Sequence, residues 1–316
     1  MTDVLTIGET MIRLSTVNYQ TVEQSGNLAF SIAGSESSVA ISLSRLGIKT
    51  IWISKLVNNF LGRKIVQEIQ KHGVDTSKVI WTDIGRVGVY FIEYGSVPRP
   101  IKILYDRKNS AINSLRPDEI DWNCLNNIKL IHLSGITPAL SKNCAKLTRT
   151  AINEAKGRKK IISFDLNYRT KLWSPYQARK FFEEVLPDVN ILIAARKDIE
   201  VIFAMKEEPD RMIEKIKRRF KNDVVVLTAG SEGAFADDGK LYFHKAPEVK
   251  VIDRIGAGDA FTAGFIYGYL KKDVELALTY ATTLAALKCT IPGDIPYITK
   301  QDVDGFIKSE HKDIER

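Results

Sequence analysis

Hydrophobic and polar positions alternate between two patterns in the first quarter of the chain. Short apolar runs at 4–8 and 51–54 are typical of buried strands. Each run is followed by a longer stretch with apolar residues at helical spacing, at 34–47 and 61–72, and each stretch ends at or just before a glycine. The pattern predicts two consecutive units of one strand and one helix.

The same alternation continues through the middle of the chain. Ser174 and Pro175 open one further helix, because serine caps a helix N-terminus and proline suits its first turn. Strands that are apolar on both faces and alternate with amphipathic helices predict a mostly parallel sheet covered by helices on each side. The fold class is therefore α/β and doubly wound. The further predicted elements are strands at 128–134, 161–166, 190–194 and 224–228 and a helix near 141–156.

A different pattern interrupts this alternation between residues 86 and 107. Two strand-like runs with period-two alternation flank a turn that contains two prolines, which predicts an antiparallel hairpin. A similar pair of runs, at 10–15 and 27–33, comes directly before the first long helix. We expect the two insertions, at about 10–33 and 84–107, to join into one small antiparallel sheet that forms a lid on a single domain spanning 1–316.

Composition limits the class of protein further. The chain has 316 residues, of which 44% are hydrophobic and 27% charged, as expected of a globular enzyme core. Its amino terminus resembles no secretion signal, and no run of about eighteen apolar residues occurs. The three cysteines are widely spaced, which favours free thiols. We expect a cytoplasmic protein without membrane contact.

The formal net charge of +8 suits an anionic partner, either nucleic acid or a small molecule that carries phosphate and carboxylate groups. Much of the excess lies at 156–160 and 215–221, where a solvated helix face is the simpler interpretation. The sequence contains no recognisable nucleic-acid module. We therefore expect small anionic ligands and no nucleic acid.

The most informative stretch is 251–270, where an extended segment meets Gly256, Ala257, Gly258 and Asp259 before an apolar helical pattern. Backbone N–H groups at a helix N-terminus lack intrahelical partners, and glycines allow an anion to approach them. Asp259 is placed to accept a proton from an attacking hydroxyl. Taken alone, the four residues favour a simpler interpretation, a tight turn in which Asp259 caps the helix. Neither a P-loop nor a Rossmann glycine pattern is present.

In its context this stretch resembles a known signature. DRIGAGDAFTAGF (253–265) is similar to the carboxy-terminal motif of the ribokinase/PfkB carbohydrate kinases, and AGSESSVAISLSRLG (33–47) resembles their amino-terminal motif. YDRKNSAI (105–112), HLSGITPALS (132–141), DLNYRTKLWS (165–174) and KCTIPGD (288–294) resemble the 2-keto-3-deoxygluconate kinases within that family. The resemblance spans nearly the whole chain.

The resemblance implies a ribokinase-like fold and an enzyme that uses ATP and Mg²⁺ to phosphorylate the C6 hydroxyl of 2-keto-3-deoxygluconate. It leaves a monovalent cation open as a further requirement. It also implies dimerisation through the lid, whose exposed face we expect to bear Val87, Val89 and Phe91. The implied site residues are Asp259 as base with Gly256, Ala257 and Gly258 as anion hole; Gly34, Tyr90, Tyr105, Arg107 and Arg169 for the sugar acid; and Thr228, Gly230 and Gly233 for the nucleotide.

The chemistry of these side chains supports the assignment. Arginine holds a carboxylate with a planar fork of donors, so Arg107 or Arg169 suits a sugar acid, although each taken singly fits a surface ion pair. Tyr90 and Tyr105 fit either substrate contact or packing on the lid. The glycines at 230 and 233 alone would indicate only a turn. His132 lies in an apolar strand, and we expect it to be a core residue.

Metal ligands remain unassigned from the sequence. Many relatives carry an Asn-Glu pair where this chain has Ala195 and Arg196, so the magnesium-organising residues are unknown. Asp165 and Asn167 fit either an outer-shell role or a structural one at a strand end. Two alternatives therefore stay open. One is another sugar kinase such as a fructokinase, and the other is a sugar-acid-binding regulator without turnover.

Overall fold

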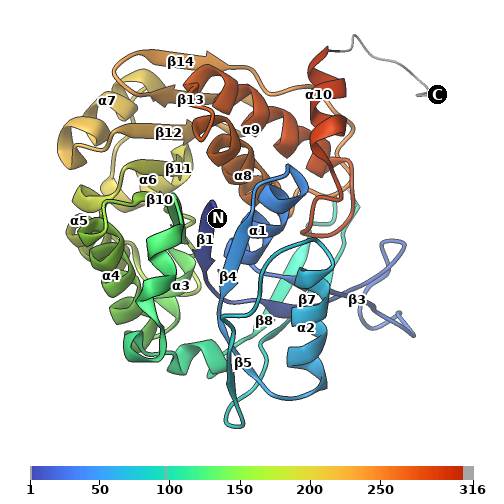
Figure 1. Cartoon of the computed structure of the whole chain (residues 1–316). Coiled ribbons are helices and arrows are strands. Elements are labelled where there is room, and N and C mark those ends of the chain that lie inside the picture. Colours follow the sequence, from blue (N-terminus) through green and yellow to red (C-terminus); the bar gives the residue numbers. More distant parts are fainter. Residues whose placement is uncertain (1, 97, 309–316) are drawn as a thin grey trace.

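A computed structural model describes residues 2–96 and 98–308, and its centre is a sheet of eight strands in the order β14-β13-β12-β11-β10-β9-β1-β4 (Figure 1). The six neighbouring strands β4, β1, β9, β10, β11 and β12 run parallel, and β13 and β14 are antiparallel to their neighbours. The strands are β1 (Val4–Ile7), β4 (Thr50–Ile53), β9 (Leu130–Ser134), β10 (Ile161–Asp165), β11 (Ile191–Ala195), β12 (Val224–Thr228), β13 (Ala234–Asp237) and β14 (Leu241–His244). This confirms the predicted fold class.

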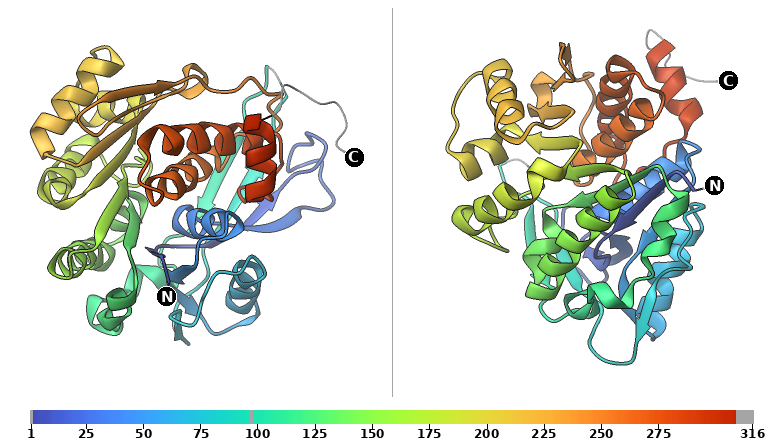
Figure 2. Two further views of the ribbon diagram at one scale, coloured as in Figure 1. Left: turned by 45° about the horizontal axis from the view of Figure 1, so that its top comes forward. Right: turned by 60° about the vertical axis from the view of Figure 1, so that its left-hand side comes forward.

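Helices cover both faces of the sheet, and Figure 2 shows that α8 and α9 lie side by side with α10 against α9. Helices α1, α8 and α9 pack on one face and α4 to α7 on the other. The helices are α1 (Ser35–Arg45), α2 (Phe60–Gln70), α3 (Ile136–Leu140), α4 (Lys142–Gly157), α5 (Pro175–Val185), α6 (Arg196–Phe203), α7 (Pro209–Phe220), α8 (Ala257–Tyr269), α9 (Val274–Cys289) and α10 (Lys300–Lys308).

The apolar strands are buried on both faces, as their composition predicts. In β12, Val224 and Val226 belong to the core under α8 and α9, whereas Val225 and Leu227 belong to the core under α4 to α7. Successive side chains of a strand point to opposite faces, so a continuous apolar run serves two cores. His132, in β9, is fully buried and hydrogen-bonds Ser163 through Nδ1 at 3.1 Å, which confirms its core position.

Sequence signals for helix starts are also borne out. Ser141 accepts the N–H of Cys144 at the start of α4, and Ser174 accepts the N–H of Gln177 at the start of α5. Such caps satisfy backbone donors that have no partner within the helix. Residues 55–57 and 80–82 add β5 (Lys55–Val57) and β6 (Ile80–Thr82), a separate parallel pair. In the described part of the chain no helix is long and apolar enough to cross a membrane.

The small second sheet joins the two predicted insertions in the order β3-β2-β7-β8. Its strands are β2 (Met11–Ser15), β3 (Ala29–Ala33), β7 (Val89–Glu93) and β8 (Lys102–Asp106). Each insertion is an antiparallel pair, but β2 and β7 join them in parallel, so the sheet is mixed and the expectation of a wholly antiparallel lid was wrong.

One face of this lid differs from the sequence-based expectation. Val87 is only 5% exposed and packs with Ile12 and Ile32 in a core that also contains residues of α2, and Val89 packs against the same core. The expectation that Val87 lies on an exposed lid face was therefore wrong. Hairpin periodicity shows which residues share a face, but it does not show that α2 covers one end of that face.

Candidate active site

A cavity of about 1440 Å³ opens at the carboxyl ends of the central strands. Its walls include the last residues of β10, β11 and β12, which are Asp165, Ala195 and Thr228. In open α/β sheets, ligands bind at this edge. A smaller pocket of about 90 Å³ lies beneath the lid, and Asp259 and Arg169 line both spaces. The residues that line both spaces stand where the two compartments meet, and they also include Ile103, Tyr105, Arg107, Ile255 and Gly256.

The N-terminus of α8 forms part of the wall between the compartments. Gly256 caps this helix with φ of +83°, a left-handed conformation that favours glycine. A Cβ atom there would also overlap the carbonyl oxygen of Asp294. Gly256 and Gly258 line the cavity, whereas the N–H of Ala257 donates to the carbonyl of Arg254 at 3.2 Å. The tight turn and the approach of an anion are thus compatible, because the same glycines serve both.

Asp259 does not cap its own helix. Its Oδ1 accepts a hydrogen bond from Ser35 Oγ at 2.6 Å, and Ser35 Oγ in turn accepts from Asn167 Nδ2 at 2.9 Å. Burial raises the pKa of Asp259 to about 6, although the bond from Ser35 and the charge of Arg169 oppose the rise. A carboxylate with such a pKa is suited to accept a proton near neutral pH.

Further carboxylates stand near Asp259. Burial and the charges of Asp259 and Asp198 raise the pKa of Asp165 to about 8, and burial also raises the pKa of Asp198. Asp165 accepts the N–H of Asn167 at 3.0 Å, and both aspartates line the large cavity. Within residues 2–96 and 98–308 no group of three or more His, Cys, Asp or Glu side chains surrounds a common metal position.

The two candidate arginines lie in different environments. Arg107 donates from Nε to Glu9 Oε2 at 2.8 Å, and the side chains are 12% and 4% exposed, so this is a buried pair and not a surface one. Arg169 donates to the carbonyl of Tyr168 at 3.2 Å, and none of the ion pairs found in the described residues involves it. The Arg169 guanidinium is the one whose charge is available to a ligand.

The other predicted sugar contacts gather in the smaller pocket. Tyr90 is 3% exposed, stacks on Tyr105 with ring centroids 5.5 Å apart, and donates its hydroxyl to Asp294 at 2.9 Å. Gly34 lines the same pocket, where a Cβ atom would overlap the carbonyl oxygen of Glu9. Both tyrosines therefore pack within the lid and also line the pocket, so the two interpretations are compatible.

The predicted nucleotide residues are not all at the cavity. Thr228 lines it, whereas Gly230 and Gly233 form the turn between β12 and β13, with φ of +62° and +128°. Ala195 also lines the cavity, but the side chain of Arg196 pairs with Glu200 on its own helix, with Nε and Oε1 3.2 Å apart. Arg196 is not among the residues that line the cavity.

Sequence reasoning missed several polar residues of the smaller pocket. Glu36 is buried with a pKa raised to about 7, and it accepts hydrogen bonds from Ser134 and Thr137 at 2.7 Å each. Glu9 lies two residues beyond the end of β1, and Ser35 follows Gly34 in the first motif. A rule that polar residues just beyond parallel strands converge at one edge would have identified Glu9. Nothing in the sequence placed Asp294 beside Tyr90.

A helix N-terminus that can hold phosphate, a carboxylate of raised pKa beside it and a lid sheet together define an enzyme of the phosphoryl-transfer class. The model of the pfkB family carbohydrate kinases matches residues 1–300. The chain therefore belongs to the pfkB family of carbohydrate kinases, which confirms the family resemblance.

Individual relatives are similar over almost their whole length. The chain is 38% identical to 2-dehydro-3-deoxygalactonokinase of Haloferax volcanii, with 99% of each chain covered. It is 30% identical to 2-dehydro-3-deoxygluconokinase of Thermoproteus tenax, with 93% of this chain and 90% of the relative covered. The crystal structure of 2-dehydro-3-deoxygluconokinase from Thermotoga maritima matches with a TM-score of 0.93 at 30% identity, covering 98% of each chain.

Proposed function

We propose that this protein phosphorylates the C6 hydroxyl of 2-keto-3-deoxygluconate with ATP, giving 2-keto-3-deoxy-6-phosphogluconate. The observation that carries the proposal is the position of Asp259, which lines both compartments at the N-terminus of α8. A phosphate donor then fits the large cavity towards Thr228, and a sugar acid fits the pocket beneath the lid. Relatives named as kinases of keto-deoxy sugar acids support the substrate class.

In this mechanism Asp259 accepts the proton of the C6 hydroxyl. The hydroxyl oxygen forms a bond to the γ-phosphorus, and the bond between the γ-phosphorus and the oxygen that bridges it to the β-phosphate breaks. The backbone at Gly256 and Gly258 forms the anion hole, where the helix N-terminus stabilises charge that develops on the phosphoryl oxygens. The N–H of Ala257 joins it only by leaving the carbonyl of Arg254. Ser35 holds the carboxylate of Asp259 in place at 2.6 Å. Thr228 and the turn that contains Gly230 and Gly233 complete the nucleotide side.

The carboxylates of the large cavity fit a Mg²⁺ ion that accompanies the nucleotide. Bound with ATP, Mg²⁺ neutralises phosphate charge, and it usually takes one or two protein carboxylates together with waters and phosphate oxygens. Asp165 and Asp198 would hold it, because a cation offsets the burial that raises both pKa values and the repulsion from Asp198 and Asp259 that raises the pKa of Asp165. This assignment does not need the Asn-Glu pair that Ala195 and Arg196 replace.

A second candidate substrate is 2-keto-3-deoxygalactonate. The galactonokinase of Haloferax volcanii is 38% identical to this chain, compared with 30% for the gluconokinase of Thermoproteus tenax. The two sugar acids are epimers that differ in configuration at one carbon. Both carry the carboxylate and the terminal hydroxyl on which the proposed contacts depend, so the epimer is decided by the remaining hydroxyl contacts beneath the lid.

The test is ATP-dependent turnover of 2-keto-3-deoxygluconate, 2-keto-3-deoxygalactonate, fructose and ribose, with the phosphorylated carbon identified by NMR. The proposal requires C6 phosphorylation of at least one keto acid with a kcat/KM far above those for both neutral sugars. A preference for fructose would establish the fructokinase alternative. Binding of a keto acid without turnover would establish the regulator alternative.

The pH dependence of kcat/KM should report Asp259 in the free enzyme. Because the base acts in its deprotonated form, we expect kcat/KM to fall as the pH falls through about 6, the pKa of this carboxyl. Ser35→Ala removes a hydrogen bond that lowers the pKa, so its acid limb should move to higher pH. An acid limb at the same pH in both proteins would contradict the assignment. The measurement is a pH–rate profile of each.

The lid also supports a proposed homodimer. One row of apolar side chains crosses all four strands on one face, through the paired positions Phe30, Leu14, Phe91 and Leu104. Phe30 and Leu104 are 48% and 66% exposed. Burial of this apolar row against a second copy of the chain is favourable, because it removes apolar side chains and the edges of strands β3 and β8 from water.

The dimer is tested by light scattering. Leu104→Asp should shift the mass of the protein from that of a dimer towards that of a monomer, because an aspartate cannot enter an apolar interface without cost. Phe243→Asp is the matched control, since Phe243 is 54% exposed on β14 and lies outside the lid. A monomeric mass for the unmodified protein, or an equal shift in both variants, would refute the lid interface.

A further inference from the structure

Lys288, in the last turn of α9, has an exposed fraction of 0%. Removing an ammonium group from water is costly unless its donors find acceptors. The proposed transfer reaction uses neither this side chain nor Arg13, which is 1% exposed. Two cations are thus buried beside the candidate site without a role in the mechanism.

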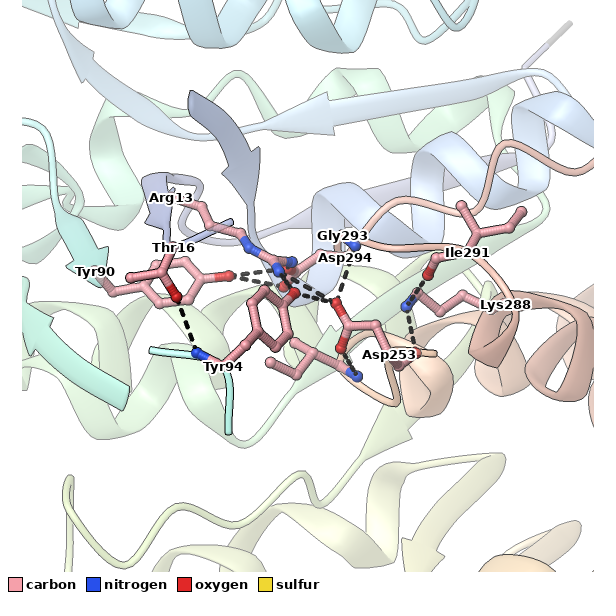
Figure 3. Close-up of polar contacts among 10 residues, drawn as sticks. Arg13, Thr16, Tyr90, Tyr94, Asp253, Lys288, Ile291, Gly293 and Asp294 are labelled. Carbon is pink, nitrogen blue, oxygen red and sulfur yellow. Dashed lines mark hydrogen bonds and ion pairs between the residues drawn. The ribbon is translucent and has the colours of Figure 1, made fainter. Parts of the chain in front are cut away.

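The contacts of Lys288 are with main-chain oxygens (Figure 3). Its Nζ donates to the carbonyl of Asp253 at 2.8 Å and to the carbonyl of Ile291 at 3.1 Å. Asp253 lies in the segment that leads into α8, and Ile291 lies in the loop that follows α9. The ammonium group therefore joins the segment that leads into α8 to the loop that follows α9.

Two carboxylates balance the two buried cations. Asp253 Oδ2 accepts from Arg13 Nη2 at 3.2 Å, and Asp253 Oδ1 accepts the N–H of Ile255 at 3.0 Å. Asp294 pairs with Arg13 and accepts the hydroxyl of Tyr90 (Figure 3). Loss of either cation would leave excess negative charge in a buried place, which is strongly unfavourable.

The network adjoins the anion hole directly. Asp253 precedes Gly256 by three residues, and the carbonyl of Asp294 lies against the Cα of Gly256, where no Cβ could fit. The charge of Lys288 also lowers the pKa of Asp259. Burial lowers the pKa of Lys288 itself, whereas Asp253 and Asp294 raise it. The position of the α8 N-terminus thus depends on the two loops that Lys288 joins.

We propose that the Lys288 ammonium is a built-in monovalent cation that positions the anion hole, so that phosphoryl transfer by this protein needs no dissolved potassium. This inference rests on the function proposed for the N-terminus of α8. Lys288 touches no reacting atom and acts through the loops, so it is a positioning residue. Carbonyl oxygens beside a carboxylate are the ligands that a hard cation would take if the ammonium were absent.

The test compares Lys288→Ala with Lys288→Met in sodium buffer and after addition of KCl, NH₄Cl or propylammonium chloride. Both variants should lose about 10²-fold in kcat in sodium, because a misplaced site costs roughly that factor. Potassium, ammonium or propylammonium should restore Lys288→Ala at least tenfold, since alanine vacates the space of the side chain. Methionine fills that space, so Lys288→Met should stay inactive.

Lys55→Ala is the matched control. Lys55 is a largely buried lysine paired with Glu119 at 2.6 Å, away from the cavity, so its variant should show no dependence on these cations. The proposal would be overturned by unchanged kcat of Lys288→Ala in sodium or by potassium activation of the unmodified enzyme. A folded but inactive Lys288→Ala that no cation restores would overturn it equally.

A second readout separates this inference from the proposed function. The thermal midpoint of Lys288→Ala should rise in potassium or ammonium relative to sodium, while that of Lys288→Met should not, because an ion that binds only the folded state stabilises it. This holds even if the unmodified protein phosphorylates none of the keto acids. Equal midpoints of Lys288→Ala in all salts would refute the cation site independently of catalysis.

Discussion

Asp259→Asn should lower kcat for keto-acid phosphorylation by about 10²- to 10⁴-fold, the range that a general base contributes. Asparagine keeps the shape of the side chain and can still accept the hydrogen bond of Ser35, but it cannot accept the proton of the C6 hydroxyl. The KM values for sugar acid and ATP should change little, because neither substrate depends on the charge of this group for its main contacts. Steady-state kinetics at pH 7.5 measure both quantities.

The control for this prediction is Asp237→Asn. Asp237 also pairs with a neighbour, Lys217, but it lies on β13 outside the cavity, so kcat should stay within about twofold. The thermal midpoint of Asp259→Asn should not fall, since replacing a buried charged carboxylate by an amide removes a desolvation cost. Retention of more than a tenth of the original kcat would refute the role of Asp259 as base.

Most of the fold could be predicted from the sequence because its strands and helices carry strong local signals. The runs at 224–228 and 161–166 are apolar on both faces, and Ser174 with Pro175 marks a helix start. These signals are local, so they can be recognised without knowledge of the rest of the chain. The parallel pairing of β2 with β7 could not be predicted, because no local pattern tells one insertion which edge of the other it joins.

The residues of the candidate site likewise include some that could be predicted from the sequence and some that could not. Gly256 and Asp259 stand in one contiguous motif, and the wider context of that motif, residues 253–265, indicates their chemistry through its resemblance to the family signature. Arg107 and Arg169 looked equivalent, yet only the structure reveals that Glu9 already neutralises Arg107. Long-range partners of this kind are set by how loops from distant elements converge. The segment KCTIPGD (288–294) carries part of the family resemblance, but the burial of Lys288 could not be predicted from it, since a lysine in a helix ordinarily faces solvent.

The difference between the two arginines leads to a test of how the sugar acid is held. Both arginines line both compartments, but none of the ion pairs found in the described residues involves Arg169, whereas Arg107 is paired with Glu9. Charge-assisted hydrogen bonds contribute about 1.5 to 3 kcal/mol. Arg169→Gln should therefore lower kcat/KM for keto acids by roughly 10- to 100-fold, mainly through KM. The kcat/KM for fructose, which has no carboxylate, should fall much less, only through the loss of a positive charge that lowers the pKa of Asp259.

The ratio of kcat/KM between keto acid and fructose is the decisive quantity, because damage to the fold or to Asp259 would lower both. Lys171→Gln is the matched control, since Lys171 lines the same cavity but donates to the carbonyl of Ile103 at 3.1 Å, and its ratio should stay within about threefold. Arg107→Gln should instead lower the thermal midpoint, because it leaves Glu9 buried without its partner. An unchanged ratio in Arg169→Gln, with a reduced ratio in a folded Arg107→Gln, would transfer the carboxylate contact to Arg107.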